Sequence, residues 1–469
     1  MGYVLDDVVQ LPLMLMRKCG SHEPRAPGER WLGAGAALTA FALVFAGGAA
    51  SSAARSTFYV DGAAPSCSDS LPSGSKAKPF CTIGAAAAHV SAGVQVKVAA
   101  GIYRERVVVD ASGTAANPIV FSPVRGARVV VTGGKNGFSV DGDSWIEISG
   151  FTVTHTEEYG ISVSHGSHVT ISHNRVRFAG QPTRGHAKYG IRLRDVTQSL
   201  VVGNTVDHNS SSGIALVDDS ALNEITGNHV FDNAKGFERA ASGIRVYASP
   251  DNAITRNVSR DNEDSGVELI RSDGNLVCNN VSYRNGDHGI DVTNDSQKTR
   301  VLANTVYRNV TAGINVEGGS TGAIVANNIS VRNGINSPRT AGDIRVDASS
   351  VRATSANYDL VHTDGGGRHV LLIWRSVDYT SLADFQLLTG QELHGVDVAP
   401  RWTDRAGGDF HLAARSPAID SATSAVRRQP LHDINGRRRT DDPATPNTGS
   451  GPRLYDDRGA FEYRPPRRH

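Results

Sequence analysis

One short phrase recurs eight times between Trp145 and Ser350, and this repeat constrains the fold more than any other feature of the chain. Each copy holds a β-branched run, an Asn, a second Asn five residues later, and then Gly-Ile or Gly-Val before an alternating strand. Clear copies read NTVDHNSSSGIALV, NVSYRNGDHGIDVT and NTVYRNVTAGINVE. Copies are about 23 to 24 residues apart, or about thirty where insertions intervene. This period, without Leu or Trp-Asp signatures, predicts a parallel β-helix with one repeat per coil.

The two Asn positions of the repeat form two columns when the coils are stacked. The first column contains Asn174, Asn204, Asn228, Asn257, Asn280, Asn304 and Asn328, and the second contains Asn209, Asn233, Asn262, Asn285, Asn309 and Asn333. Stacked coils lie roughly 4.8 Å apart, so the amides can hydrogen-bond along each column. We therefore interpret these Asn residues as structural. The Ile or Val after each Gly, and the residue two positions later, are expected to point inward.

The composition excludes some partners. A chain of 469 residues could hold several ordinary domains, but coils that bury their faces only on their neighbours escape that rule. The formal net charge is only +1, so there is no global basic field for nucleic acid, and none is expected as a partner.

The N-terminal region resembles an export signal. Residues 1–54 include arginines, the apolar stretch WLGAGAALTAFALVFAGGAA and a run of small residues, which together are typical of a cleaved signal peptide. A single uncleaved membrane anchor is the alternative. Residues before Met16 look unlike a signal, so we hypothesise that Met16 is the true start. Secretion is expected, and Cys67 and Cys81 are suitably placed to close a disulfide, while Cys278 is expected to be a packed thiol.

The mature chain divides into three predicted parts. Residues 55–95 form an N-terminal cap, in which CTIGAAAAHVSAG is expected to be a helix that ends at Gly93. Residues 96–350 form the β-helix. Residues 351–469, with the helix candidate SLADFQLLTG, form an irregular segment that returns along the solenoid and closes its C-terminal end.

Several segments resemble a known superfamily. The opening FYVDG, KPFCTIGAAAAHV and VAAGIYRERVVV resembles the start of secreted right-handed parallel β-helix proteins of the pectate-lyase-like superfamily, and SPAID and RGAFEY are similar to their closing segment. The resemblance implies an all-β fold, a right-handed parallel β-helix. That fold carries lyases, hydrolases, epimerases and adhesion proteins, so it does not by itself fix the function.

Carboxylates interrupt the repeat on one face. When the coils are aligned on the Gly of the Gly-Ile step, Asp264 and Asp287 lie two residues before it, and Glu268 and Asp291 lie two after it. Four carboxylates on adjacent coils raise one another's pKa unless a cation compensates, and hard oxygen ligands suit Ca²⁺. The alternative is a solvated acidic patch neutralised by nearby arginines.

The local motif carries a second resemblance. The segments NEDSGVE and NGDHGID are similar to the calcium-binding acidic coil of family-nine polysaccharide lyases. Carried over by position, the resemblance implies that Asp264, Glu268, Asp287 and Asp291 ligate Ca²⁺. This chain departs from the family pattern, because Asp-His and Asp-Ser replace the adjacent acidic pair and one ligand is Glu.

A lyase of a uronate polymer needs a positive charge beside the substrate carboxylate and a base for the C5 proton. The resemblance implies a Lys base, but no Lys stands in these columns. The candidates are Lys235, in the insertion AKGFERAAS, Arg245 and His288. Arginine holds its proton too firmly for an easy base and better suits carboxylate binding. Each candidate has a bland alternative: Lys235 as a plain loop lysine, His288 as an exposed turn residue and Arg245 as an ion-pair partner.

Other polar residues of the same face were assigned to substrate binding. They are Lys188, Arg192, Arg194, Tyr247 and Asn315.

Three functions remain open from the sequence. The first is a secreted, Ca²⁺-assisted polysaccharide lyase that acts as a monomer on an acidic polysaccharide and has no stable membrane span after signal cleavage. The second is a glycoside hydrolase or a uronate C5-epimerase on the same scaffold. The third is a noncatalytic cell-surface solenoid that binds carbohydrate.

Overall fold

The computed structural model describes residues 56–181, 188–335, 337, 339–363 and 369–465. The chain divides into two compact units, Met1–Ser52 and Ala53–His469. The first unit, with the expected signal segment, lies outside the described residues. None of the helices in the described ranges is both long enough and apolar enough to cross a membrane.

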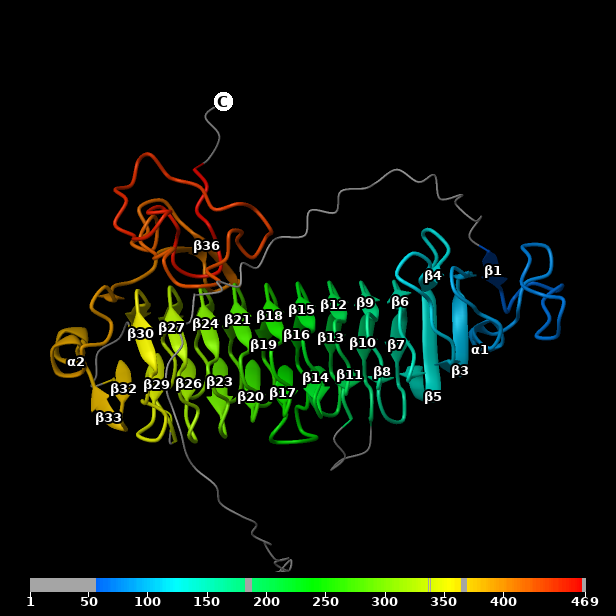
Figure 1. Ribbon diagram of the computed structural model, residues 1–469, viewed down its shortest axis with the longest axis horizontal. Helices are drawn as coiled ribbons and strands as arrows, with labels where there is room; N and C mark the ends of the chain where they lie inside the picture. Colours follow the sequence, from blue (N-terminus) through cyan, green and yellow to red (C-terminus); the bar gives the residue numbers. More distant parts are fainter. Residues whose placement is uncertain (1–55, 182–187, 336, 338, 364–368, 466–469) are drawn as a thin grey trace, which may run out of the picture. The chain divides into compact units, whose positions relative to one another are not determined.

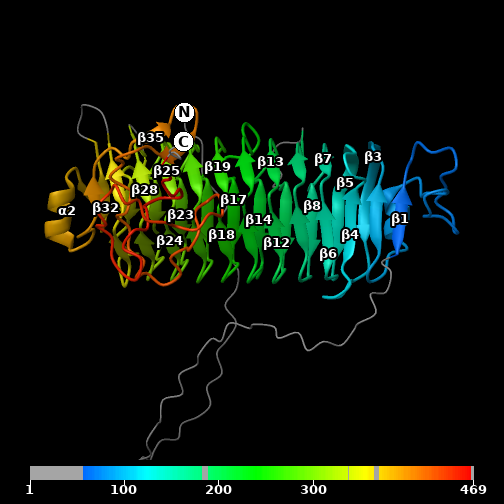
Figure 2. The same cartoon turned by 90° about the horizontal axis from the view of Figure 1, so that it is seen from above.

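The described unit is built from coils stacked in a row, with α1 near one end and α2 at the other (Figures 1 and 2). Its first sheet runs along the stack and contains twelve strands in the described ranges, each paired in parallel with the next coil. These strands are β1 (Thr57–Val60), β2 (Gln95–Val98), β4 (Ile119–Pro123), β6 (Ile146–Ser149), β9 (Thr170–Ser172), β12 (Leu200–Val202), β15 (Glu224–Thr226), β18 (Ala253–Thr255), β21 (Leu276–Cys278), β24 (Arg300–Leu302), β27 (Ile324–Ala326) and β30 (Ser355–Asn357).

The second sheet follows the same axis in two rows, which begin together in the long strands β3 (Gly101–Val109) and β5 (Val129–Asp141). The middle row continues with β7 (Thr152–Thr154), β10 (Arg175–Arg177), β13 (Thr205–Asp207), β16 (His229–Phe231), β19 (Val258–Arg260), β22 (Val281–Tyr283), β25 (Thr305–Tyr307), β28 (Ile329–Val331), β31 (Leu360–His362) and β34 (Val396–Asp397). The groove row continues with β8 (Ile161–Ser164), β11 (Ile191–Arg194), β14 (Ile214–Val217), β17 (Ile244–Tyr247), β20 (Val267–Ile270), β23 (Ile290–Thr293), β26 (Ile314–Val316), β29 (Ile344–Val346) and β32 (Leu372–Trp374).

The alternation within each groove-row strand places apolar side chains inside the solenoid. Ile244 and Val246 of β17 are fully buried, whereas Arg245 between them points outward and is partly exposed. The expected inward positions are therefore confirmed. Because every coil adds the same inward pair, the core continues along the stack as one apolar cluster.

Buried Asn side chains link the coils into two hydrogen-bonded ladders. In the first ladder, Nδ2 of Asn204 donates to Oδ1 of Asn228 at 3.0 Å and to the backbone oxygen of Ile171 at 2.9 Å. In the second ladder, Nδ2 of Asn285 donates to Oδ1 of Asn309 at 3.0 Å. The structural role that the sequence assigned to these residues is confirmed, since their amides satisfy backbone groups at every turn.

The N-terminal coil is covered by α1 (Ile83–Ala87) and a disulfide-closed loop. Thr82 caps the helix, and Glu105 accepts hydrogen bonds from the N–H groups of Ile83 and Gly84 at 2.9 and 2.7 Å. The expected extension of this helix to Gly93 is wrong, because the helix is capped at Ala88 and Gly93 adopts a left-handed turn.

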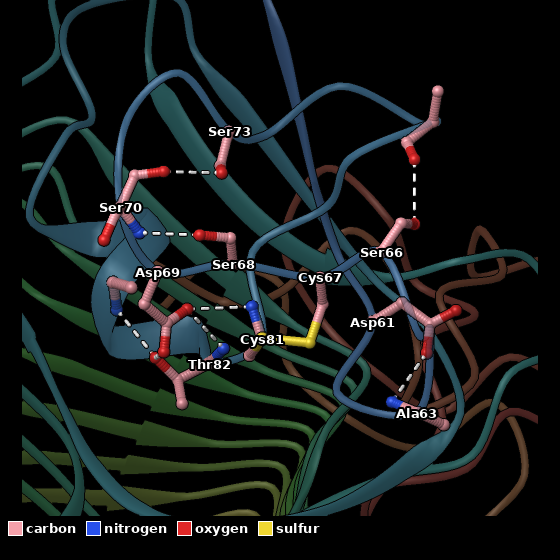
Figure 3. The surroundings of a disulfide bond; sticks show 12 residues. Asp61, Ala63, Ser66, Cys67, Ser68, Asp69, Ser70, Ser73, Cys81 and Thr82 are labelled. Atoms are coloured by element: carbon pink, nitrogen blue, oxygen red, sulfur yellow. Dashed lines mark hydrogen bonds between the residues drawn. A yellow bond between two sulfur atoms is a disulfide. The ribbon is translucent and has the colours of Figure 1, made fainter.

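The Cys67–Cys81 disulfide is formed, as the sequence allowed (Figure 3). Beside it, a carboxylate oxygen of Asp69 accepts hydrogen bonds from the backbone N–H groups of Cys81 and Thr82 at 2.8 and 3.1 Å. The disulfide and these bonds hold the loop against the start of α1. Cys278 is a buried free thiol, and burial raises its pKa to about 12, so the expectation of a packed thiol is confirmed.

The other end of the stack is closed by α2 (Leu382–Thr389) and by β33 (Val377–Tyr379), which turns back antiparallel on β32. After α2 the chain runs back beside the coils and forms the hairpin β35 (Trp402–Asp404) and β36 (Asp409–Leu412) (Figure 1). This return segment is bonded to the first sheet and the middle row: Asn279 donates to the backbone oxygen of His432, and Asn327 to that of Thr423.

Candidate functional site

The outward residues of the groove row form one column along the stack. The strand registers pair Ser162 with Arg192, Arg245 with Glu268, and Glu268 with Asp291. The alignment of coils on the Gly-Ile step therefore gives the observed neighbours. Cationic side chains stand over β11 and β17, and carboxylates follow over β20 and β23.

A groove of about 450 Å³ lies over the cationic part of this column. Arginines and tyrosines dominate its lining, together with two acids and one valine, and the residues are Tyr159, Tyr189, Arg192, Arg194, Val217, Asp218, Glu238, Arg245 and Tyr247. They come from the groove-row strands, from the residues just before them, and from the insertion that precedes β17. Three predicted substrate-binding residues, Arg192, Arg194 and Tyr247, thus share one cavity with Arg245.

Arg192 is held in place on the floor of the groove. Its guanidinium donates to the hydroxyls of Ser162 and Ser164, at 3.0 to 3.2 Å, and lies 4.2 Å from the ring centroid of Tyr159. The rings of Tyr159 and Tyr189 are stacked with their centroids 5.9 Å apart. A cation fixed against an aromatic face is preorganised for an anionic ligand, because little side-chain freedom remains to be lost on binding.

Arg245 marks the boundary between the groove and the acids. Its Nη1 donates to the backbone oxygen of Ala240 at 2.8 Å, and its Nε lies 3.9 Å from Oε2 of Glu268. Oε2 of Glu268 also accepts a hydrogen bond from Ser242 at 2.8 Å. Arg245 therefore serves both as an ion-pair partner, the alternative weighed from the sequence, and as part of the groove lining.

The four predicted acids do lie together, and burial governs their protonation. Burial and the nearby charges of Glu268 and Asp287 raise the pKa of Asp264 to about 8. Burial also raises the pKa of Glu268 above its usual range, and burial with the charge of Glu268 raises that of Asp291 well above its usual range. We call Asp264, Glu268, Asp287 and Asp291 the acidic cluster. It concentrates negative charge, or shared protons, in a poorly solvated space.

His288 lies inside the acidic cluster rather than on the surface. It is only 5 % exposed, so the exposed turn residue considered from the sequence is wrong. Its Nδ1 is 3.6 Å from a carboxylate oxygen of Asp287 and 3.8 Å from one of Asp291, and its Nε2 hydrogen-bonds to Thr340 at 2.9 Å. Burial lowers the pKa of His288, although Asp287 acts in the opposite direction, so the imidazole is neutral near pH 7.

The donor set was compared with what Ca²⁺ requires. Carboxylate oxygens are suitable ligands, but they already have partners: Asp291 accepts from Asn315 at 2.7 Å, and Asp287 accepts from Thr311 and Arg339. Among the residues that the structure describes, no group of three or more His, Cys, Asp or Glu side chains is arranged to hold a metal ion. The acidic cluster is thus not a preassembled cation site, and Ca²⁺ stays a prediction.

Three other predicted residues lie outside the groove lining. Lys235 is 3.5 Å from Asp232 at the end of β16, and Lys188 is 3.2 Å from Glu158. Asn315 is fully buried, and both ends of its amide are bonded, to Asp291 and to Arg345. Lys235 thus behaves as the loop lysine considered above, and Asn315 positions charged neighbours rather than presenting its amide to a ligand.

Two groove residues had no assigned role from the sequence. Burial raises the pKa of the Tyr189 hydroxyl, while Arg245 and Arg192 act in the opposite direction. Oε2 of Glu238 is buried and has no hydrogen-bond partner among the described residues. The recurrence of Tyr-Gly at Tyr159 and Tyr189 was a signal for the first, whereas Glu238 lies in an insertion that follows no repeat.

Comparisons with known proteins agree with this architecture. The model of the family described as "Right handed beta helix region" matches residues 124–247 and 237–330. The uncharacterized protein YwoF of Bacillus subtilis (strain 168) is 25% identical over 441 residues, which cover 74% of this chain and 89% of that protein.

Solved structures show the same fold. The crystal structure of pectate lyase Pel9A aligns with a TM-score of 0.52 and 17% identity, over 87% of this chain and 96% of that one. An alginate lyase from Paenibacillus sp. str. FPU-7 aligns with a TM-score of 0.44 and 20% identity, over 52% of this chain and 90% of that one. The protein is a right-handed parallel β-helix of the pectate-lyase-like kind, as its sequence predicted.

Proposed function

We propose that this protein is a secreted polysaccharide lyase that cleaves a uronate-containing polymer in the groove over β8, β11, β14 and β17. The observation that carries the proposal is the groove lining, which combines three arginines with three tyrosines. Guanidinium groups bind carboxylates through paired hydrogen bonds. Tyrosine rings offer flat apolar faces and a polar edge, which suits sugar rings.

The arginines supply the charge that the reaction needs. In β-elimination the C5 proton leaves, the bond between C4 and its oxygen breaks, and a double bond forms between C4 and C5. The C5 proton becomes more acidic when the adjacent carboxylate is neutralised. Arg192, Arg194 and Arg245 border one cavity and would hold that carboxylate.

Tyr189 and Glu238 would move the two protons. Because burial raises the pKa of Tyr189, its hydroxyl stays protonated near neutral pH and can donate to the departing O4. The unpartnered carboxylate oxygen of Glu238 would accept the C5 proton. We assign no step to Lys235, which lies against Asp232, or to His288, which is enclosed by the acidic cluster.

Calcium assistance is a separate part of the proposal. If the acidic cluster held Ca²⁺, through Asp264, Glu268, Asp287 and Asp291, the ion would help to neutralise a substrate carboxylate. No step above depends on it. Calorimetric titration of the protein with Ca²⁺, and activity with and without a chelator, test this part independently.

The test of the function is incubation of the purified protein with pectate, alginate and uronate-containing glycosaminoglycans. Unsaturated products that absorb in the ultraviolet are expected from at least one polymer. Absence of such products from all of them would reject a lyase. A glycoside hydrolase is the second candidate, because Asp218 and Glu238 both line the groove. It would release reducing ends without ultraviolet absorbance.

A further inference from the structure

The outward column of the groove row changes charge within one coil. Arg245 on β17 is paired in register with Glu268 on β20, which is paired with Asp291 on β23. Adjacent coils are roughly 4.8 Å apart, a length comparable with one sugar ring. A polymer lying along the groove therefore places one sugar over the arginines and a neighbouring sugar over the acidic cluster.

The acidic cluster is unsuited to a second uronate. Asp264 already has Glu268 and Asp287 close enough to raise its pKa to about 8. Glu317, on the next coil, adds a further negative charge near Asp291. A carboxylate on the bound sugar would add to this repulsion in a poorly solvated space, where charges interact strongly.

His288 gives an independent indication of what the cluster can accept. It is 5 % exposed, and its Nδ1 has no hydrogen-bond partner in the described part of the chain. Since Nε2 bonds to Thr340, we assign the ring proton to Nε2, which leaves a lone pair on Nδ1 facing Asp287 and Asp291. The space is thus surrounded by acceptors and lacks a donor.

We propose that the acidic cluster is the subsite next to the groove and binds an amino sugar through its ammonium group. The inference rests on the lyase function proposed above, and it makes the substrate a polymer in which uronate alternates with an amino sugar. An ammonium group carries one positive charge and three N–H donors, with no acceptor. It therefore supplies what Asp264, Glu268 and His288 lack, without the converging ligand geometry that a metal ion requires.

The ligand test uses oligosaccharides of equal length and near-neutral pH in the presence of a chelator. They are an alternating glucuronate–glucosamine chain with free amines, its N-acetylated counterpart, and an oligogalacturonate. Binding is measured by calorimetry on the full chain carrying Tyr189→Phe, so that cleavage does not consume the ligand. The free-amine chain is expected to bind at least about tenfold more tightly than the other two. Equal affinity for the N-acetylated chain, or tighter binding of oligogalacturonate, would overturn the proposal.

Variants separate the cluster from the rest of the surface. Glu268→Gln is expected to reduce the preference for the free-amine chain to near parity, whereas Glu224→Gln, an exposed carboxylate on β15, keeps it. Retention of the full preference by a folded Glu268→Gln variant would contradict the proposal. The wild-type ligand comparison remains decisive if that variant fails to fold.

Turnover assays on the same ligands distinguish the two proposals. Selective binding of the free-amine chain without cleavage of any polymer by the wild-type protein would reject the lyase and leave the subsite standing. Cleavage of polygalacturonate with no amine preference would do the reverse.

Discussion

Oδ1 of Asp343 accepts hydrogen bonds from both the backbone N–H and the Nδ2 of Asn333, each at 3.0 Å. This carboxylate therefore ends the second Asn ladder. Its other oxygen accepts a hydrogen bond from the backbone N–H of His362 at 3.1 Å. Asp343 is fully buried, and burial raises its pKa well above the usual range.

Replacing Asp343 with Ala should destabilise the protein. The variant leaves three buried N–H donors, on Asn333 and His362, without an acceptor, and each such group costs about 1 to 3 kcal/mol. We expect a loss of about 3 kcal/mol in the free energy of unfolding, measured by denaturant titration. Asp219→Ala, at an exposed carboxylate, is the control and should stay within about 0.5 kcal/mol. Similar stability of the two variants would contradict this role.

Removal of the Cys67–Cys81 disulfide should loosen the N-terminal cap. The bond closes a loop with a sequence separation of 14, and a loop of that length is worth about 3 kcal/mol in the unfolded chain. The double variant Cys67→Ser, Cys81→Ser is expected to expose the amides of β1 and α1 to faster hydrogen exchange. Amides of β20 and β23, far along the stack, serve as the internal reference and should exchange as in the wild type.

Two groove variants should affect different kinetic constants. Arg192→Ala removes a charge that would hold the substrate carboxylate, so the KM for the cleaved polymer should rise about tenfold or more. Tyr189→Phe keeps the ring stacked on Tyr159 but removes the proton donor, so kcat should fall by about 10² or more. Arg256→Ala, whose guanidinium lies near Glu224 of the first sheet, is the matched control. Unchanged kcat in Tyr189→Phe would remove Tyr189 from the reaction.

The buried pair Asp359 and Glu392 should make stability depend on pH. Burial raises the pKa of Asp359 to about 6 and, with the charge of Asp359, raises that of Glu392 well above its usual range. The folded state therefore binds protons that the unfolded state releases near pH 4. Stability should be greatest below that pH for this pair and should decline as the pH rises through about 6 and beyond.

The variant Asp359→Asn tests this coupling. Its amide can still accept from Asn328 through Oδ1 and can donate to Glu392, so the pair no longer needs a shared proton. The melting temperature of the variant should fall less than that of the wild type between pH 4 and pH 7. Parallel curves would show that the pair does not share a proton.

The repeat allowed the fold and one column of the site to be predicted. Asn ladders and Gly-Ile steps fix the register, because a shift by one residue would turn buried side chains outward. That register placed Arg245 beside Glu268, and Glu268 beside Asp291, as the structure has them. Arg345 belongs to the same column, but Asp343-Ile344 replaces Gly-Ile at its coil, so the alignment stopped one coil early.

Other parts of the site follow no period. Glu238 lies in an insertion, and Arg339, which contacts Asp287, lies between two coils of different length. Such segments take their conformation from distant contacts rather than from local pattern. The burial of His288 depends on Thr340 from that same region, so its turn position in the sequence suggested exposure instead.

The return segment changes how the solenoid can come apart. In a simple stack each coil depends only on its two neighbours, and loss of order can spread from either end. Here Arg439 bonds to Asn279, Gly459 to Asn327 and Ala460 to Thr305, which ties several successive coils to one short stretch of chain. Those coils must therefore melt together, and during synthesis they remain without this support until the residues around Arg439 and Gly459 have been made.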